Sequence, residues 1–90
     1  MKLDHLENYI RGWVAGSFDQ TILKTDKFEA AVKYYKVGEY EPSHCHKLTS
    51  EINIVVSGHI RMNGKEYKAK EIIIIEPGEY TDFETLTETV

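Results

Sequence analysis

The feature that most constrains this chain is a series of short β-branched runs, each closed by a turn signal. The longest purely aliphatic run is Ile72–Ile75, and Ile52–Val56 is similarly brief. Asn63-Gly64 separates two further runs, and this dipeptide favours a two-residue type I′ turn because both central positions need a positive φ. Short strands separated by turns are typical of antiparallel sandwiches and barrels. The sequence therefore predicts an all-β fold.

Individual elements can be assigned from the same pattern. Six runs are expected to form strands, namely residues 12–18, 30–37, 52–56, 60–62, 65–67 and 72–75. The run Ile72–Ile75 is apolar at every position, so we expect it to be buried on both faces. Residues 1–11 form an N-terminal segment in which Leu3, Leu6 and Ile10 share one helical side, which predicts at most one short helix.

The size and charge of the chain exclude several classes of protein. Its 90 residues predict one domain over residues 1–90, and so small a core gains stability from barrel closure or from pairing with a second copy. The net charge of −4 and the absence of clustered Lys and Arg argue against nucleic-acid binding. No apolar run is long enough to span a bilayer, and the N-terminus does not resemble a secretory signal. We therefore expect a cytoplasmic protein.

Three residues form a candidate metal-ligating set. His44 and His46 are separated by one residue, so in a strand their side chains project to the same face. Glu51 lies beyond a possible turn at residues 47–50, and antiparallel pairing of the flanking strands brings its carboxylate beside the imidazoles. Two imidazoles and one carboxylate suit non-haem Fe(II) and also occur at catalytic zinc, with positions left open for water or substrate. The bland alternative is that all three are ordinary surface residues.

The spacing around these residues is similar to a known family motif. The stretch reads Gly38, five residues, His44-x-His46, four residues, Glu51, six residues, Gly58. It matches the first cupin motif at every fixed position, so the chain resembles a small single-domain cupin. The resemblance implies a double-stranded β-helix, a short antiparallel barrel or jelly roll, with a metal inside near one mouth. It also implies that the two histidines and the glutamate are three of the four usual ligands of one divalent ion, Fe, Zn, Ni or Mn.

The second cupin motif, which supplies the fourth ligand, is degraded. Alignment on Gly78 places Thr81 where the family has its ligand histidine and Thr85 where it has an asparagine. Lys70 and Glu76 likewise replace a glycine and a proline. The resemblance therefore implies that the hairpin is retained and the fourth ligand is lost.

The functional expectation follows from these motifs. The leading interpretation is a metal-dependent protein that binds or acts on a small molecule. The sequence leaves open whether it is an enzyme. If it is one, small cupins suggest a dioxygenase or a sugar or keto-acid isomerase. The alternative is a non-catalytic binding or sensor module that has lost its metal, which the missing fourth ligand favours. A homodimer is also expected. Cupins usually continue with a further core strand where this chain has only Thr89-Val90, so the last strand is short or absent and leaves an open edge. A second copy, or alternatively the N-terminal segment, is expected to cover that edge.

Overall fold

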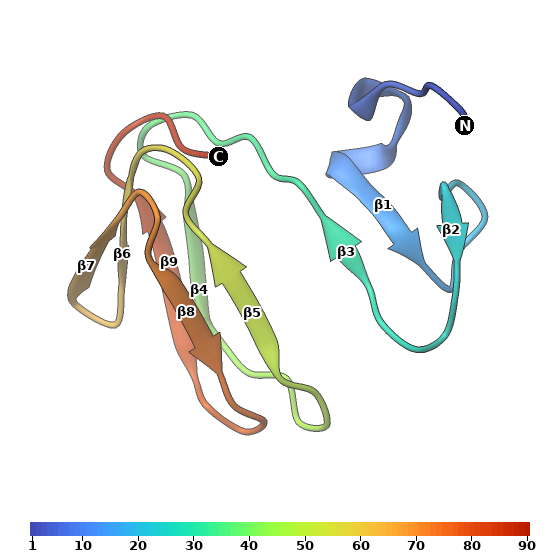
Figure 1. The fold of residues 1–90 in the computed structure, drawn as a ribbon. Coiled ribbons are helices and arrows are strands. Elements are labelled where there is room, and N and C mark those ends of the chain that lie inside the picture. Colours follow the sequence, from blue (N-terminus) through green and yellow to red (C-terminus); the bar gives the residue numbers. More distant parts are fainter. The chain divides into compact units, whose positions relative to one another are not determined.

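The computed structural model describes all 90 residues, Met1–Val90, and divides into two compact units (Figure 1). The N-terminal unit is Met1–Tyr34 and the C-terminal unit is Tyr35–Val90. Strand accounts for 40% of the residues and no α-helix is present, which confirms the all-β prediction. No helix has the length and apolar character needed to cross a membrane. The single domain expected over residues 1–90 stays a prediction, since two compact units can belong to one domain.

The N-terminal unit contains a small mixed sheet. Its strands β1, β2 and β3 are ordered β2-β1-β3, with β1 parallel to β2 and antiparallel to β3. Two 3₁₀ turns precede them, and the bounds of all five elements are η1 Leu6–Asn8, η2 Ile10–Gly12, β1 Trp13–Gly16, β2 Leu23–Lys24 and β3 Ala30–Ala31. The strand expected over residues 30–37 is therefore much shorter in the structure, with only an isolated bridge at Tyr35 further along.

The α-helix allowed for the first residues is not formed. The Asp4 side chain accepts hydrogen bonds from the Tyr9 hydroxyl, from the Asn8 amide and from the backbone N–H of His5. These bonds, that from Tyr9 foremost, hold the pKa of Asp4 below its ordinary value. A side chain that competes for local donors in this way favours turns over helix.

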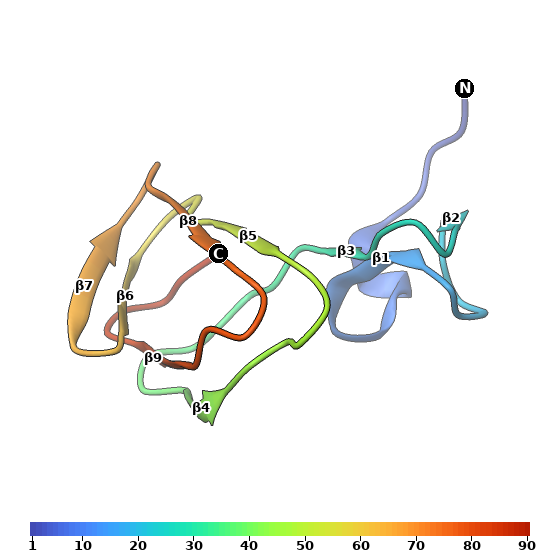
Figure 2. The same cartoon turned by 90° about the horizontal axis from the view of Figure 1, so that it is seen from below.

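The C-terminal unit consists of two antiparallel sheets in two layers. One has the strand order β4-β9-β6-β7 and the other pairs β5 with β8 (Figure 2). The bounds of the strands are β4 Tyr40–His44, β5 Glu51–Ile54, β6 His59–Met62, β7 Lys65–Lys68, β8 Ile72–Ile75 and β9 Thr81–Thr85.

The pairing of these six strands is nested. β6 pairs with β7, β5 with β8 and β4 with β9, so the unit is one antiparallel ribbon folded back at the β6–β7 turn. Asn63 and Gly64 form that turn with φ of 50° and 78°, which confirms the predicted hairpin. The ribbon also coils, because β9 pairs with β6 as well as with β4. A bridge between Tyr35 and Thr89 adds one more rung beyond β4 and β9.

The hydrophobic core lies between the two sheets of the C-terminal unit. Its buried members come from β6, from β8 and from the residue that follows β5, and partly buried side chains pack around them. Val55, Ile60, Met62 and Ile75 are buried, and Tyr67, Ile73 and Phe83 surround them. The expectation that Ile72–Ile75 is buried on both faces is wrong for the single chain. Ile73 and Ile75 face the core, whereas Ile72 and Ile74 are exposed, because the four-stranded sheet of the C-terminal unit packs on one face of the two-stranded sheet only.

Candidate metal site

The three predicted ligands lie on one short segment at one end of the C-terminal unit. His44 is the last residue of β4, His46 lies in the loop that follows, and Glu51 is the first residue of β5. The β8–β9 loop lies beside this segment (Figure 1), and the backbone N–H of Gly78 donates to the His46 carbonyl oxygen over 2.8 Å. The two sequence motifs are therefore joined by a direct backbone contact.

A bulge in β4 sets the direction of His44. Glu41 pairs with Phe83 and His44 pairs with Thr81, so three steps along β4 match two along β9. Pro42 lies within this irregularity, on an edge strand, where the missing N–H costs no ladder hydrogen bond. Without the extra residue, strand alternation would place Glu41 and His44 on opposite faces. The bulge places both opposite residues of β9 that share the inner face.

The two imidazoles lie next to each other. Their ring centroids are 5.6 Å apart, and the ring planes meet at 80°. Nδ1 of His44 lies 3.0 Å from the Pro42 carbonyl oxygen. Because a carbonyl oxygen only accepts hydrogen bonds, Nδ1 carries the proton in this contact, and Nε2 is left as the free electron-pair donor of the neutral ring.

Glu51 joins the set through its contact with His46. Its Oε1 lies 3.6 Å from Nε2 of His46, and both side chains are partly exposed. Its Oε2 accepts a hydrogen bond of 3.1 Å from the Asn53 amide. Asn53 lies two residues further along β5 and shares the inner face with Glu51, so it holds the carboxylate in place.

The donor atoms do not converge on one point in this structure. No group of three or more His, Cys, Asp and Glu side chains is arranged to hold a metal ion. His46 and Glu51 form a close pair, and His44 adjoins them through its ring. The donor types suit a divalent transition metal, since they combine neutral imidazole with carboxylate. Metal binding through His44, His46 and Glu51 stays a prediction.

Thr81 lies directly across the ladder from His44. Residues that face each other in an antiparallel pair project to the same side of the sheet. The side chains of Thr81 and His44 therefore share one face, at the position where the second motif has its histidine. The hydroxyl of Thr81 is a weak ligand for a transition metal compared with an imidazole.

Tyr35 and Asn53 belong to this region, and the sequence pattern did not single them out as site residues. Burial, followed by the negative charges of Glu41, Glu39 and Glu51, raises the pKa of Tyr35 to about 12. The Tyr35 ring also packs against Phe83, with ring centroids 5.0 Å apart. Strand alternation from Glu51 could have pointed to Asn53. Nothing local could have found Tyr35, whose ring extends toward the site from the opposite end of the unit by packing against Phe83 of β9.

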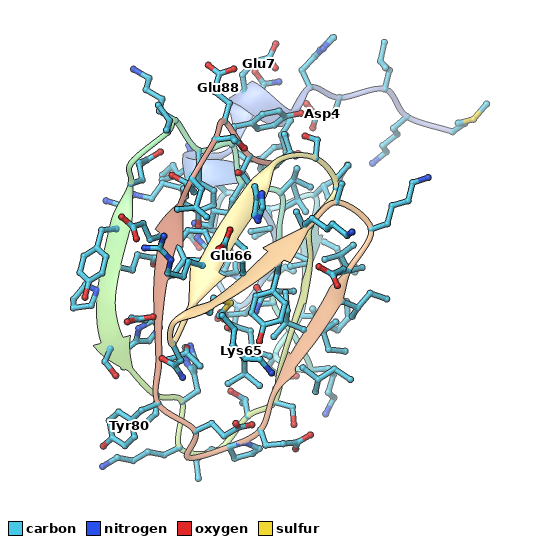
Figure 3. The ribbon with its side chains drawn as sticks, turned by 90° about the vertical axis from the view of Figure 1, so that its left-hand side faces the viewer. Asp4, Glu7, Lys65, Glu66, Tyr80 and Glu88 are labelled. Atoms are coloured by element: carbon cyan, nitrogen blue, oxygen red, sulfur yellow. The ribbon has the colours of Figure 1, made fainter.

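Cys45 lies between the two histidines on the segment that links β4 to β5. It is a half-buried free thiol. A hydrogen bond with Cys45 raises the pKa of Tyr80, and Figure 3 shows Tyr80 at the end of the unit where the β8–β9 loop turns. The thiol therefore packs against the same loop that contacts His46.

The two glycines that frame the first motif have a structural reason to be glycine. Gly38 and Gly58 have φ of 83° and 98°, values that other residues rarely adopt. A Cβ on Gly58 would also lie 2.3 Å from the carbonyl oxygen of Glu88. Both residues turn the chain at the end of the unit opposite the histidines, where Thr85 binds the turn at Gly38. They shape the strands that carry the donors.

A second His–Glu pair lies away from the candidate site. Nε2 of His59 is 3.1 Å from Oε1 of Glu66 across the β6–β7 ladder, and Figure 3 shows Glu66 on this hairpin. Both side chains are about as exposed as those of His46 and Glu51. No third donor accompanies this pair, so it serves as an internal reference for an ordinary surface ion pair.

The resemblance to the cupins rests on the sequence of residues 38–58, which includes His44, His46 and Glu51. Comparisons of the chain with models of known protein families, with curated proteins and with solved structures find no match.

Proposed function

We propose that this chain is a small cupin-type protein that holds one divalent metal ion through His44, His46 and Glu51, and that binds a small molecule at the open coordination positions. The observation that carries the proposal is that the three side chains lie next to one another on one segment. Glu51 lies 3.6 Å from His46, and the two imidazoles adjoin with centroids 5.6 Å apart.

The strand pairing supports the cupin-type architecture. A double-stranded β-helix is an antiparallel ribbon that coils on itself. The nested pairs β4·β9, β5·β8 and β6·β7, with the additional contact between β6 and β9, have that character. Two facing antiparallel sheets built in this way are the plan of a jelly roll. No hydrogen-bonded ladder joins the two sheets of the C-terminal unit, so the proposal concerns the coil and not a closed barrel.

The hydrogen bonds around the donors support the metal site. Metal-binding histidines usually donate the other ring N–H to a carbonyl or carboxylate oxygen, which fixes the tautomer. Nδ1 of His44 does so toward Pro42. The Asn53 amide fixes Glu51 in the same manner. Such supporting partners are found for two of the three proposed ligands.

The chain's own residues define what the site offers a ligand. A bound divalent ion would polarise an oxygen-bearing group. The raised pKa of Tyr35 keeps its hydroxyl protonated near neutral pH, where it can donate a hydrogen bond but cannot act as a base. Thr81 leaves the fourth ligand position without a strong donor. We therefore favour ligand binding at this site.

The rival function is a binding or sensor module that has no metal. Two observations favour it: the donors do not converge in this structure, and Thr81 stands in place of a ligand histidine. In that case the inner face would bind a small molecule through hydrogen-bonding groups such as Tyr35 and Asn53.

The test is metal binding by untagged protein. Titration calorimetry with Zn²⁺, Ni²⁺, Mn²⁺ and anaerobic Fe²⁺ should give one site per chain for at least one ion. His44→Ala, His46→Ala and Glu51→Gln should each weaken binding by at least about tenfold, since even outer-shell partners control affinity on that scale. Circular dichroism should show that all three variants stay folded, because the side chains are partly or fully exposed.

His59→Ala is the matched control. It removes a histidine of similar exposure that is also paired with a glutamate. Its metal affinity should equal that of the wild type. An equal loss in His59→Ala and His46→Ala would mean nonspecific surface binding, and absence of binding by the wild type would leave the metal-free module as the function.

A further inference from the structure

Three connections lie at the end of the C-terminal unit that carries the candidate site, namely the β4–β5 loop, the β6–β7 turn and the β8–β9 loop (Figure 1). The β8–β9 loop is bonded to both of the others. On one side, the backbone N–H of Gly78 donates to the His46 carbonyl oxygen over 2.8 Å. On the other side, Nδ2 of Asn63 donates to the Tyr80 carbonyl oxygen over 2.8 Å. The β6–β7 turn is therefore connected to a proposed metal ligand through one loop.

The side chain of Asn63 takes the place of a backbone peptide group beside β9. The last pair of the ladder between β6 and β9 is Arg61 with Glu84, and β6 ends one residue later. Beyond that pair, Oδ1 of Asn63 accepts a hydrogen bond of 3.1 Å from the backbone N–H of Asp82, while Nδ2 donates to Tyr80. A carboxamide offers a carbonyl acceptor and an N–H donor, as a peptide group does. The side chain therefore extends the ladder past the end of β6.

A third hydrogen bond runs in the opposite direction. The Asp82 carboxylate accepts it from the backbone N–H of Asn63 over 2.6 Å. We call Asn63 and Asp82, with these three hydrogen bonds, the turn clasp. The two β9-side residues bonded to the carboxamide, Tyr80 and Asp82, flank Thr81, and Thr81 pairs with His44. The turn clasp thus holds the backbone on both sides of the residue that lies opposite His44.

We propose that Asn63 and Asp82 are positioning residues of the candidate metal site, an inference that rests on the proposed function. Neither is a ligand. They hold the first residues of β9 so that Thr81 stays opposite His44. They also keep the β8–β9 loop bonded to the His46 carbonyl oxygen. A metal site gains affinity when supporting hydrogen bonds hold its ligands in place before the ion binds.

The first test uses metal-free protein. Asn63→Gly removes the carboxamide but keeps a residue that suits the positive φ of the turn. Amide hydrogen exchange measured by NMR should be at least about fivefold faster at Gly78 in this variant, because the loop loses one of its anchors. Exchange should rise much less at Leu86, whose N–H bonds to the His59 carbonyl oxygen at the other end of β9. An unchanged rate at Gly78, or an equal increase at both amides, overturns the proposal.

The second test is calorimetry with Zn²⁺, Ni²⁺, Mn²⁺ and anaerobic Fe²⁺, each added alone. Asn63→Gly and Asp82→Ala should each weaken binding of the ion that the wild type holds by about tenfold. Asp82→Asn should keep the wild-type affinity, since its carboxamide oxygen still accepts from the N–H of Asn63. Glu71→Ala is the matched control. It removes a carboxylate that accepts a backbone N–H of Lys68 over 2.7 Å at the opposite end of the unit, and its affinity should equal that of the wild type.

The calorimetry separates a failure of this inference from a failure of the proposed function. A wild type that binds an ion, together with an Asn63→Gly variant of equal affinity, overturns the positioning role alone. Equal losses in Asn63→Gly and Glu71→Ala also overturn it, since any lost side-chain bond would then weaken the site. A wild type that binds none of the four ions overturns the proposed function and, with it, the role of the turn clasp at a metal site.

Discussion

The β6–β7 hairpin and the β4–β5 segment both carry a histidine close to a glutamate, yet their surroundings differ sharply. In the hairpin, Ile60 and Met62 are buried and form much of the core. In the segment, every residue of β4 is exposed, and the pair His46–Glu51 lies beside a second imidazole. The shorter His–Glu contact, 3.1 Å against 3.6 Å, belongs to the hairpin.

The comparison shows that a close His–Glu contact is not in itself a sign of a site. What distinguishes the β4–β5 segment is the second imidazole, the tautomer-fixing carbonyl of Pro42 and the amide of Asn53. It also shows that the proposed binding residues and most of the core residues lie on different parts of the ribbon. Binding segments are commonly drawn from the less stable parts of a fold.

The largest expected effect is a loss of stability when a core residue of the β6–β7 hairpin is truncated. Ile60→Ala should lower the free energy of unfolding by about 2–5 kcal/mol, because Ile60 is 3% exposed and its removal leaves a cavity. Ser43→Ala in β4 should change it by less than about 0.5 kcal/mol, since the side chain is exposed. Urea denaturation of the two variants measures both values. Equal losses would mean that β4 is packed against something in solution.

The next effect concerns metal affinity at the candidate site of the β4–β5 segment. Thr81→His should raise metal affinity by about tenfold to a hundredfold, because an imidazole would face His44 across the ladder in place of a hydroxyl. Calorimetry with Zn²⁺, Ni²⁺ and Fe²⁺ measures the change. Thr87→His, at an exposed position beyond β9, is the control and should have no effect. A folded Thr81→His variant with unchanged affinity for all three ions would remove the site from this face.

The smallest effect concerns Tyr35. Its pKa of about 12 lies above the ordinary value of 10.0, so the folded state holds the proton more tightly than the unfolded state. The associated stability is complete below pH 10 and is lost as the pH rises toward 12. Because the residue is only half-buried, we expect a loss of about 1 kcal/mol. Denaturation at several pH values should show it in the wild type but not in Tyr35→Phe, and a parallel decline in both would assign the loss to other groups.

Much of the fold was predictable, and the reason is local. The Asn63-Gly64 turn follows from the positive φ that both positions need, and β5, β6, β7 and β8 follow from the short runs that were expected to form strands. The strands β4 and β9 were not among those runs. The N-terminal unit was predicted less well. Its first residues satisfy their donors through Asp4 and form 3₁₀ turns, and the strand expected over residues 30–37 is reduced to Ala30–Ala31. Hydrophobic pattern alone does not reveal such competition from side chains.

The candidate site was predictable in its residues but not in its arrangement. The spacing of His44, His46 and Glu51 indicated one segment, because strand alternation places His44 and His46 on the same face. The bulge at Pro42, which decides the face of His44, depends on pairing with β9 some forty residues away. Tyr35 likewise approaches the region only because its ring packs against Phe83, which is distant in the sequence.

The sequence by itself determined the central strands β5 to β8 of the C-terminal unit, the position of the hairpin turn, and which side chains have metal-binding chemistry. These properties depend on φ preferences, residue type and spacing over a few positions. Only the tertiary structure decided that β4 lies beside β9, that Thr81 faces His44, and that Ile73 and Ile75 of β8 face the core of the C-terminal unit. Those outcomes depend on how the ribbon coils. The sequence of β8 shows that both faces of the strand are apolar, but the coiling of the ribbon determines which face packs against the core.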